Sequence, residues 1–396
     1  MNPKVSIGVK TKVALVCLTN RGLDTIQRIG EALPNKVSRS FFIHEKVLGQ
    51  NKHQGEVHKQ GYLQEQVQRQ VQGQGLEEQL RRDSKMQLQV FSRLSDVISR
   101  LWQEYTVLIF VMASGIVIRQ IAPLIERKDR DPAVLVLDEE GKFVIPLLSG
   151  HLGGANAWAQ QISEQIGALP VITTATDVRG MVAPDEYARR YGWKVEPIHH
   201  LPMVNRLLLD QKLLKVWIGL PSLTKHINTW LKDSHYLFLS ENDNEKANII
   251  IDAFPNSNIN EDCLYLIPPI LSVGVGCRRG VSREIILERI RIAVEQLGAS
   301  LKAISGIYSI DLKSNEAGLI EVANYLRVPF QTFRADELQS VNLQEQLSRS
   351  NFVREKIGVD GVCEAASLLG AQRGRLVLPK TKGQGVTVAI SIENSL

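Results

Sequence analysis

The most informative pattern of apolar and polar positions lies between residues 107 and 177. Residues 107–113 form a continuous apolar run of strand length, rich in β-branched and aromatic side chains, which is typical of a strand buried on both faces. Turn residues, apolar runs and a helical repeat follow it. The pattern predicts these further elements in order: a strand at 133–138, a hairpin turn at 138–143, a strand at 143–150, a helix at 155–167 ending at Gly167, and a strand at 170–175.

Strands and helices also alternate in the rest of the chain. Upstream, the pattern predicts a strand at 13–18, a helix at 23–32, a strand at 40–45 and an amphipathic helix at 91–105. Downstream, it predicts helices at 186–193, 203–214, 282–298 and 359–371, strands at 215–220, 235–240, 247–254 and 386–392, and a loop at 376–385. This alternation predicts an α/β fold of several domains, with mostly parallel sheets flanked by helices and a separate α/β domain at the C-terminal end.

Composition shifts divide the chain into three predicted domains. The first is residues 1–177, the second is the less distinctive block 178–269, and the third is the α/β domain 270–396, which follows Pro268-Pro269. Residues 50–89 hold about a dozen glutamines and few aromatic or β-branched side chains. Such a segment buries too little apolar surface to offset the entropy of ordering, so we interpret it as a flexible insertion in the first domain.

The overall composition excludes several classes of protein. With 396 residues and a net charge of +5, the chain has room for two or three cores but lacks the dense basic stripe of a nucleic-acid binder. The sequence has no run of about 18 apolar residues, so no membrane span is predicted. The four cysteines have no paired spacing, which favours a reducing cytoplasm over a disulfide framework and gives no metal-binding motif.

The polar residues at the predicted strand ends suggest a binding site. Glycines in the segment SGHLGGAN allow a ligand to approach the backbone closely, and the first turn of the following helix favours an anion. In an open parallel sheet, ligands bind at the carboxyl ends of the strands. We therefore expect one cleft to be lined by Ser114, Ser149, His151, Asn156, Thr174 and Asp177.

Each of these features also has a purely structural interpretation. Gly153 and Gly154 are equally typical of close helix-to-strand packing. His151 is compatible with a helix cap, and the hydroxyls of Ser149 and Thr174 with caps on backbone N–H groups. The combination of a glycine pair, a histidine, two hydroxyls, an amide and a carboxylate is nevertheless more polar than a plain crossover requires.

Loops of the third domain provide a possible anion-binding rim. Arg278 and Arg279 lie in GVGCRRG, where guanidinium groups can clamp carboxylates, although exposed arginines are often simply solvated. Lys313 and Glu316 lie in the loop before a helix, and Lys380 lies in the predicted loop at 376–385. The GVGCRRG segment fits the dinucleotide-binding pattern G-x-G-x-x-G poorly, so we do not expect a nicotinamide cofactor.

Several longer segments resemble one known family. FVMASGIVIRQIAPL, DPAVLVLDEEGKFVIPLLSGHLGGAN and VITTATD resemble the cobalt-precorrin-5A hydrolase (CbiG) family of anaerobic cobalamin biosynthesis, and VGVGCRRG, SIDLKSNEAGLIEVA and VPFQTF resemble its C-terminal domain. The Gln-rich insertion has no counterpart in that family. Ser114 stands where the family commonly has threonine, which keeps the hydroxyl.

The resemblance implies a cytoplasmic hydrolase that acts on a carbon–carbon bond. Members of the family open the δ-lactone of a ring-contracted cobalt corrinoid, release acetaldehyde and leave cobalt-precorrin-5B. The implied substrate is a polycarboxylate cobalt corrinoid, and no protein cofactor or metal site is implied, because the cobalt arrives with the substrate. Transient contact with neighbouring enzymes of the pathway is compatible with this function; nucleic acid and membrane partners are not expected.

We assign provisional roles on this basis. His151 is the predicted general base or acid, Asp177 orients His151 or acts as the base, and Ser149 is a weaker candidate for a nucleophile because the G-x-S-x-G elbow is absent. Backbone N–H groups at Gly153 and Gly154 are predicted to stabilise the oxyanion. The predicted substrate-binding residues are Ser114, Gly115, Arg119, Gly150, Gly153, Gly154, Asn156, Thr173, Thr174, Arg278, Arg279, Lys313, Glu316 and Lys380.

Two alternatives remain open. A corrinoid carrier would use the same glycine loops only to grip carboxylates, without turnover. A nucleotide-binding enzyme would use SGHLGG as a phosphate loop, but the missing G-K-[ST] ending argues against it.

Overall fold

The structure is a computed structural model of the 396-residue chain. It describes residues 11–34, 37–48, 86–225, 227–240, 243, 246–255, 263–349, 354–355, 358–372 and 374–393. The chain divides into two compact units, Lys10–Arg189 and Arg190–Leu396, and each is described by itself. The three domain boundaries given above stay predictions, and all but residues 86–89 of the predicted insertion lie outside the described residues.

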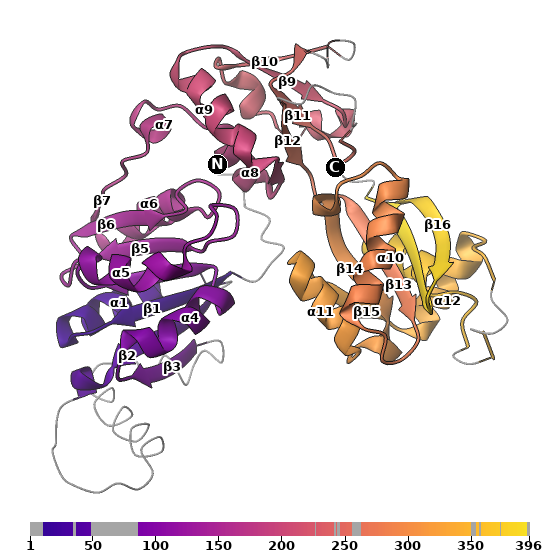
Figure 1. Ribbon diagram of the computed structural model, residues 1–396, viewed down its shortest axis with the longest axis horizontal. Helices are drawn as coiled ribbons and strands as arrows, with labels where there is room; N and C mark the ends of the chain where they lie inside the picture. Colours follow the sequence, from indigo (N-terminus) through magenta and orange to yellow (C-terminus); the bar gives the residue numbers. More distant parts are fainter. Residues whose placement is uncertain are drawn as a thin grey trace, which may run out of the picture. The chain divides into compact units, whose positions relative to one another are not determined.

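The first unit is built on a seven-stranded sheet with the order β3-β2-β1-β4-β5-β6-β7 (Figure 1). Its strands are β1 (Lys12–Cys17), β2 (Ser38–His44), β3 (Met86–Phe91), β4 (Val107–Val111), β5 (Ala133–Leu137), β6 (Phe143–Leu148) and β7 (Leu169–Pro170). The first five are mutually parallel; β6 is antiparallel to β5, and β7 is parallel to β6. The α/β class predicted from the sequence is confirmed.

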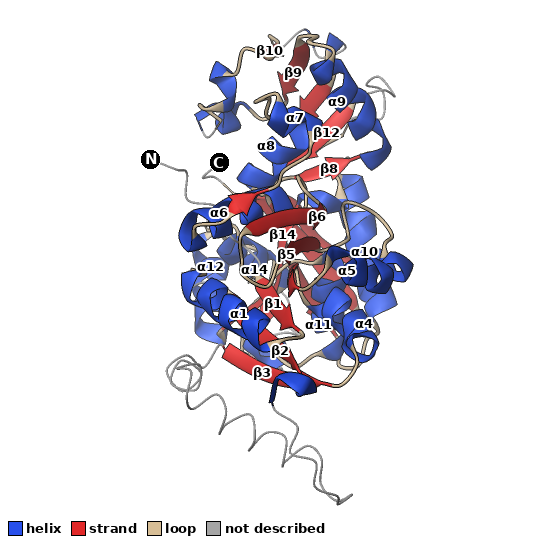
Figure 2. Cartoon of the chain, turned by 90° about the vertical axis from the view of Figure 1, so that its left-hand side faces the viewer, coloured by secondary structure: helices blue, strands red, loops and turns tan. Residues whose placement is uncertain are grey.

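Helices cover both faces of this sheet, so its central strands are apolar throughout. Val13, Leu15 and Cys17 of β1 face one cluster, whereas Ala14 and Val16 face the other. Figure 2 shows the two helical layers on either side of the sheet. The first layer contains α1 (Asn20–Ala32) and α6 (Ala155–Ile166), and the second contains α4 (Leu94–Glu104) and α5 (Ser114–Ile121).

The β5–β6 hairpin reverses the direction of the chain, and this corrects the expected cleft. Leu148, at the end of β6, lies beside Val134, near the start of β5. The loop after β6 therefore lies at the edge where the parallel strands begin. Ser114 follows β4 and lies at the opposite edge, about four residues of strand or 13 Å away. The rule that ligands bind at strand carboxyl ends applies to parallel strands, and β6 is antiparallel to β5.

Two predicted elements in this unit also change. The strand expected at 170–175 is only β7, and a short helix, α7 (Ala175–Val178), takes up the residues that follow it. Residues 86–89, assigned to the insertion, belong to the edge strand β3, which pairs with β2 in parallel. The unit ends within α8 (Pro184–Tyr191).

In its described residues, the second unit contains a central and a C-terminal sheet, each of five strands. The central sheet has the order β10-β9-β11-β12-β8 and is parallel except for the antiparallel β8. The strands are β8 (Lys194–Glu196), β9 (Leu214–Ile218), β10 (Tyr236–Phe238), β11 (Ile249–Ile251) and β12 (Leu264–Ile267). Helix α9 (Leu201–Leu209) buries Leu201, Val204 and Leu208.

The C-terminal sheet has the order β15-β14-β13-β17-β16. Its strands are β13 (Leu271–Cys277), β14 (Ile304–Ile310), β15 (Phe330–Phe333), β16 (Arg375–Gly383) and β17 (Val386–Ile392), and its helices are α10 (Arg283–Gln296), α11 (Ala317–Leu326), α12 (Ala335–Gln344) and α14 (Cys363–Gly370). Strands β13, β14 and β15 are parallel, so their carboxyl ends share one edge. The loop predicted at 376–385 is wrong: most of it is the edge strand β16, which contains Lys380.

Two chain-wide features bear on the sequence predictions. All four cysteines are free thiols, as their spacing predicted. Among the described residues, no helix combines the length and the apolar character needed to cross a bilayer.

Candidate active site

The loop that joins β6 to α6 has a tightly constrained backbone. Ser149 adopts a φ of 58° and its Oγ donates a hydrogen bond to the carbonyl oxygen of Asp131 at 3.2 Å. A Cβ on Gly153 would lie 2.4 Å from the Cβ of Ser149 and 2.8 Å from its carbonyl oxygen, so only glycine fits there. The hydroxyl of Ser149 thus holds the loop against the start of β5.

The carbonyl groups of this loop cap the N-terminus of α6. The N–H groups of Gly154, Ala155 and Asn156 donate to the carbonyl oxygens of His151, Ser149 and Gly150 at 3.0, 3.1 and 3.1 Å. The N–H group of Gly154 is therefore not free to bind an oxyanion. In the same loop, the N–H groups of residues 150–153 have no hydrogen-bond partner among the described residues. Gly153 remains available for the predicted role.

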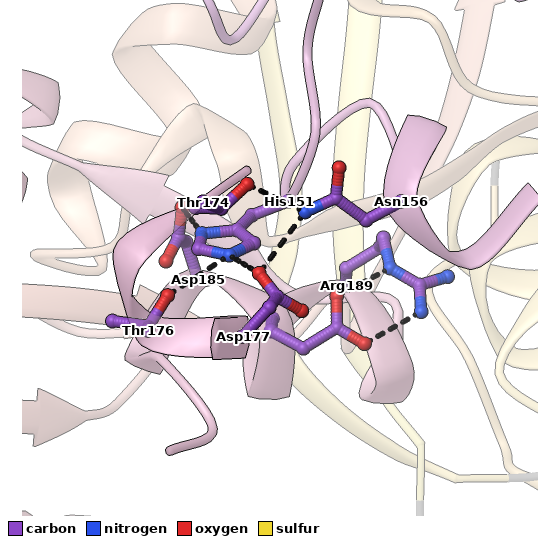
Figure 3. A network of polar contacts seen from close by, with 8 residues as sticks. His151, Asn156, Thr174, Thr176, Asp177, Asp185 and Arg189 are labelled. Carbon is purple, nitrogen blue, oxygen red and sulfur yellow. Dashed lines mark hydrogen bonds and ion pairs between the residues drawn. The ribbon is translucent and has the colours of Figure 1, made fainter. Parts of the chain in front are cut away.

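His151 lies at the centre of a polar network (Figure 3). Its Nε2 is 2.9 Å from Oδ2 of Asp177 and 3.2 Å from Oγ1 of Thr176. The Nδ2 group of Asn156 donates both to that same Asp177 oxygen, at 3.0 Å, and to Oγ1 of Thr174, at 2.9 Å. The structure thus brings together side chains from the β6–α6 loop, from α6 and from the segment after β7. The loop after β6 and the segment after β7 meet because β6 and β7 are parallel neighbours.

A second carboxylate, which the sequence pattern does not single out, contacts the other ring nitrogen of His151. Oδ2 of Asp185, on α8, is 3.3 Å from Nδ1 of His151. The side chains of His151 and Asp185 are 11% and 5% exposed, whereas that of Asp177 is 35% exposed. Asp185 follows Pro184 at the start of a helix, where an acidic residue ordinarily complements the helix dipole, so its position gave no separate signal.

The surroundings of His151 favour its protonated form. Burial lowers the pKa of His151, but the contact with Asp185 and then the contact with Asp177 outweigh burial and raise it from 6.5 to about 9. The arrangement holds an imidazolium between two carboxylates, in the loop whose N–H groups at residues 150–153 have no hydrogen-bond partner among the described residues. Such a site can move a proton between His151 and Asp177, and it can donate hydrogen bonds to a developing negative charge.

Other predicted residues of the first unit lie outside this network. Ser114, Gly115 and Arg119 lie on α5 at the opposite edge of the sheet, where Nη1 of Arg119 donates to the carbonyl oxygen of Gly115 at 2.9 Å. Thr173 is exposed in the segment between β7 and α7 and makes no hydrogen bond with a described residue. It is close in sequence to the network without being part of it.

The predicted residues of the C-terminal domain separate into two groups. Arg278 and Arg279 are exposed directly after β13. At the same edge, Oε2 of Glu316 pairs with Nζ of Lys313 at 2.7 Å, and Oε1 of Glu316 accepts from the N–H group of Gly280 at 2.7 Å. Lys380 belongs to the other group: it lies on the edge strand β16, and its Nζ donates to Oγ of Ser348 at 2.8 Å.

The pKa of Glu316 is lowered, mainly by the hydrogen bond from Lys313. In the described ranges, no group of three or more His, Cys, Asp and Glu side chains is arranged to hold a metal ion.

Comparison with known proteins identifies the family. Family models for the N-terminal part, the central region and the C-terminus of cobalamin synthesis protein G match residues 96–177, 182–268 and 271–391. The cobalt-precorrin-5A hydrolase of Salmonella typhimurium (strain LT2) is 34% identical over 296 residues, which cover 73% of this chain and 82% of that protein. The chain belongs to the cobalt-precorrin-5A hydrolase (CbiG) family. The resemblance stated from the sequence is thereby confirmed.

Another curated relative and two solved structures are also similar to this chain. The cobalt-precorrin-5A hydrolase of Priestia megaterium is 29% identical, covering 78% of this chain and 85% of that protein. The crystal structure of a cobalamin biosynthesis protein G homologue from Sulfolobus solfataricus is 18% identical and covers 98% of this chain and 99% of that chain, with a TM-score of 0.36. The crystal structure of CobE, a protein from the cobalamin biosynthetic pathway, is 31% identical over 32% of this chain and 92% of that chain, with a TM-score of 0.30.

The His151 network crosses the join between two of the matched family regions. His151 and Asp177 fall in the region matched by the N-terminal model, whereas Asp185 falls in the region matched by the central model. In the structure all three residues belong to the unit Lys10–Arg189. The boundary between the two family regions therefore runs through the site in sequence, whereas the structure keeps its residues in one unit.

Proposed function

We propose that this chain is a cobalt-precorrin-5A hydrolase, which opens the δ-lactone of a ring-contracted cobalt corrinoid and releases acetaldehyde to give cobalt-precorrin-5B. Relatives in Salmonella typhimurium and Priestia megaterium carry that name. The observation that carries the proposal is the 2.9 Å contact between His151 and Asp177, beside the unpaired N–H groups of residues 150–153. A proton-transfer pair next to oxyanion donors is the equipment that ester hydrolysis requires.

The proposed reaction has two steps. Water adds to the lactone carbonyl carbon, the ring C–O bond breaks, and a carboxylic acid and an alcohol are formed. The alcohol then loses its proton, its carbon becomes the carbonyl carbon of acetaldehyde, and the carbon–carbon bond to the macrocycle breaks. The electron pair of that bond stays with the conjugated macrocycle, and the protons released pass to solvent.

The loop after β6 suits the first step. Addition of water places negative charge on the carbonyl oxygen, and N–H groups at residues 150–153 are free to donate to it. One such donor typically contributes about 10²–10³ in turnover. Asn156, which donates to both Thr174 and Asp177, would orient the substrate at the rim of the network together with Thr174. Ser149 is the poorest nucleophile candidate, because its hydroxyl is bonded to the Asp131 carbonyl group.

Substrate binding is proposed to involve the C-terminal domain as well. The corrinoid carries several carboxylates, and Arg278, Arg279 and Lys313 supply cations at the edge where β13, β14 and β15 end. Glu316 would position Lys313 and the Gly280 turn. The proposal needs no cofactor or metal held by the protein, since cobalt belongs to the substrate. It places the enzyme in the cytoplasm, in transient contact with the enzymes that supply and remove the corrinoid.

A non-catalytic corrinoid carrier is the second candidate. The exposed Arg278 and Arg279 favour it, because they offer binding to carboxylates at an edge where the acidic Glu316 is already paired with Lys313. Such a protein would grip the intermediate and pass it on unchanged.

The two candidates are separated by an anaerobic incubation of the full chain with cobalt-precorrin-5A. Acetaldehyde is trapped as its hydrazone, and the corrinoid mass is measured in the same sample. The hydrolase predicts acetaldehyde in equal amount to a corrinoid that has gained water and lost the two-carbon unit. Tight binding of an unchanged corrinoid would favour the carrier instead.

A further inference from the structure

His151 lies between two carboxylates that come from separate segments of the chain (Figure 3). Asp177 on α7 contacts Nε2 at 2.9 Å, and Asp185 on α8 contacts Nδ1 at 3.3 Å. An ionised carboxylate can only accept hydrogen bonds, so each ring nitrogen must carry a proton to donate to its partner. Both contacts are satisfied together only when the ring is the imidazolium cation.

Asp185 depends on that charge. Its side chain is 5% exposed and its Oδ1 makes no hydrogen bond. Within the described residues, His151 is the cation that contacts it, because the neighbouring Arg189 forms a bidentate pair with Glu186 at 2.7 and 2.8 Å. A buried carboxylate without a paired cation is strongly unfavourable, so the proton on Nδ1 stabilises the folded unit.

The remaining groups around the ring do not oppose the positive charge. Asn156 on α6 and Thr176 on α7 are neutral, and the titratable groups that face the ring are Asp177 and Asp185. The charged pair of Glu186 and Arg189 lies on α8, with Arg189 against Gly154. The raised pKa of His151, at about 9, agrees with this arrangement.

We infer that Asp185 is a positioning residue that fixes His151 as the imidazolium, so that His151 is the proton donor of the hydrolysis and Asp177 is its base. This inference rests on the function proposed above. The attacking water gives its proton to the Asp177 carboxylate as its oxygen bonds to the lactone carbon. As the ring C–O bond breaks, the departing alcohol oxygen takes the Nε2 proton of His151.

The same geometry restores the starting state. After lactone opening, Asp177 is protonated and His151 is neutral, with Oδ2 and Nε2 2.9 Å apart. Transfer of the proton from Asp177 to Nε2 regenerates the carboxylate and the imidazolium without another residue. Throughout the cycle, Asp185 keeps the proton on Nδ1 and thereby fixes the orientation of the ring.

The charge of His151 can be measured without substrate, by ¹⁵N nuclear magnetic resonance on the full chain labelled at histidine. The ring nitrogen shifts of His151, identified by their loss in His151→Gln, are followed between pH 5.5 and 10. We expect both ring nitrogens to be protonated at pH 7.5, and the titration midpoint to fall by about one to two pH units in Asp185→Asn. The ring signals of His235, which contacts Asp233 at 2.8 Å, serve as an internal check that Asp185→Asn is folded.

Two results would overturn the inference. One is an unprotonated ring nitrogen of His151 at pH 7.5 in the natural chain. The other is a folded Asp185→Asn variant whose His151 midpoint does not move. Either result would leave the hydrolase assignment intact if acetaldehyde is still formed.

A second readout follows turnover itself. The pH profile of kcat is expected to fall on the alkaline side near pH 9, and in Asp185→Asn this limb should move to lower pH by the same shift seen in the titration. A purely structural role for Asp185 would lower kcat equally at every pH. The titration shift without any acetaldehyde would support the charge state and overturn the proposed function, so the two failures are distinguishable.

Discussion

Two glycine-containing loops of this molecule each follow an apolar strand, yet they suit different tasks. In the loop after β6, His151 is mostly buried and contacts two carboxylates. In the loop after β13, Arg278 and Arg279 are exposed to solvent. The first arrangement perturbs a pKa and can move protons, whereas the second can bind anions with little effect on stability. Charged residues after a strand do not by themselves define catalysis; burial and mutual contact do.

Asp177→Asn, in the site of the loop after β6, should have the largest effect on turnover. It removes the charge that contacts His151 while keeping the size of the side chain, so we expect kcat to fall by about 10²–10³-fold, or ~3–4 kcal/mol. Anaerobic acetaldehyde release at saturating corrinoid measures the loss. Corrinoid affinity should stay within about threefold of the natural chain. Unchanged turnover in the folded variant would remove Asp177 from the proposed mechanism.

The stability of the first unit should depend on the charge of His151. Its pKa is raised from 6.5 to about 9 in the folded chain, so its contribution is fully present below pH 6.5 and is lost as the pH rises through about 9. The contribution is on the order of 2–3 kcal/mol. Denaturant unfolding at pH 6 and pH 10 measures it as the difference between the natural chain and His151→Gln. If that difference is the same at both pH values, His151 carries no charge-dependent stability.

Gly153→Ala should disrupt the loop after β6 without changing any charge. The added Cβ would lie 2.4 Å from Cβ of Ser149, and relief of that overlap should lower the free energy of unfolding by about 1–3 kcal/mol. Gly167→Ala is the matched control. Gly167 has a φ of 74° but open space around its Cβ position, so it should lose only about 1 kcal/mol. Equal losses in both variants would contradict the close packing at Gly153.

Replacing Arg278 and Arg279 together by alanine should have the smallest effect on the protein itself. Both side chains are exposed, so unfolding should change by no more than about 0.5 kcal/mol. If they bind substrate carboxylates, KM should rise about tenfold, or ~1.4 kcal/mol, at unchanged kcat. A fall in kcat at saturating substrate would contradict the view that the loop after β13 only binds anions.

The sequence was sufficient for those features that depend on local pattern. Apolar runs located β4, β5 and β6, and turn residues located the hairpin. The structure brings His151 together with Asp177, Asn156 and Thr174, as the sequence pattern predicts. His151 and Asn156 follow β6, whereas Thr174 and Asp177 follow its neighbour β7.

Features that depend on contacts between distant segments could not be predicted from local sequence pattern. The sequence pattern predicts Ser114 in the same cleft, but the β5–β6 hairpin reverses the chain, so the loop after β6 lies at the edge opposite to Ser114. Asp185 lies on a helix whose contact with the loop has no local signature. The sequence predicts a loop around Lys380, because β16 is a half-exposed edge strand with register shifts and therefore lacks a clear alternation.

The most direct test of the central claim is turnover by His151→Gln, measured together with corrinoid binding in the same anaerobic sample. The account predicts that the variant is folded, binds cobalt-precorrin-5A with the affinity of the natural chain within about threefold, and releases acetaldehyde at least about 10²-fold more slowly. Release of acetaldehyde at the natural rate by the folded variant would show that the chemistry takes place elsewhere and would contradict the account.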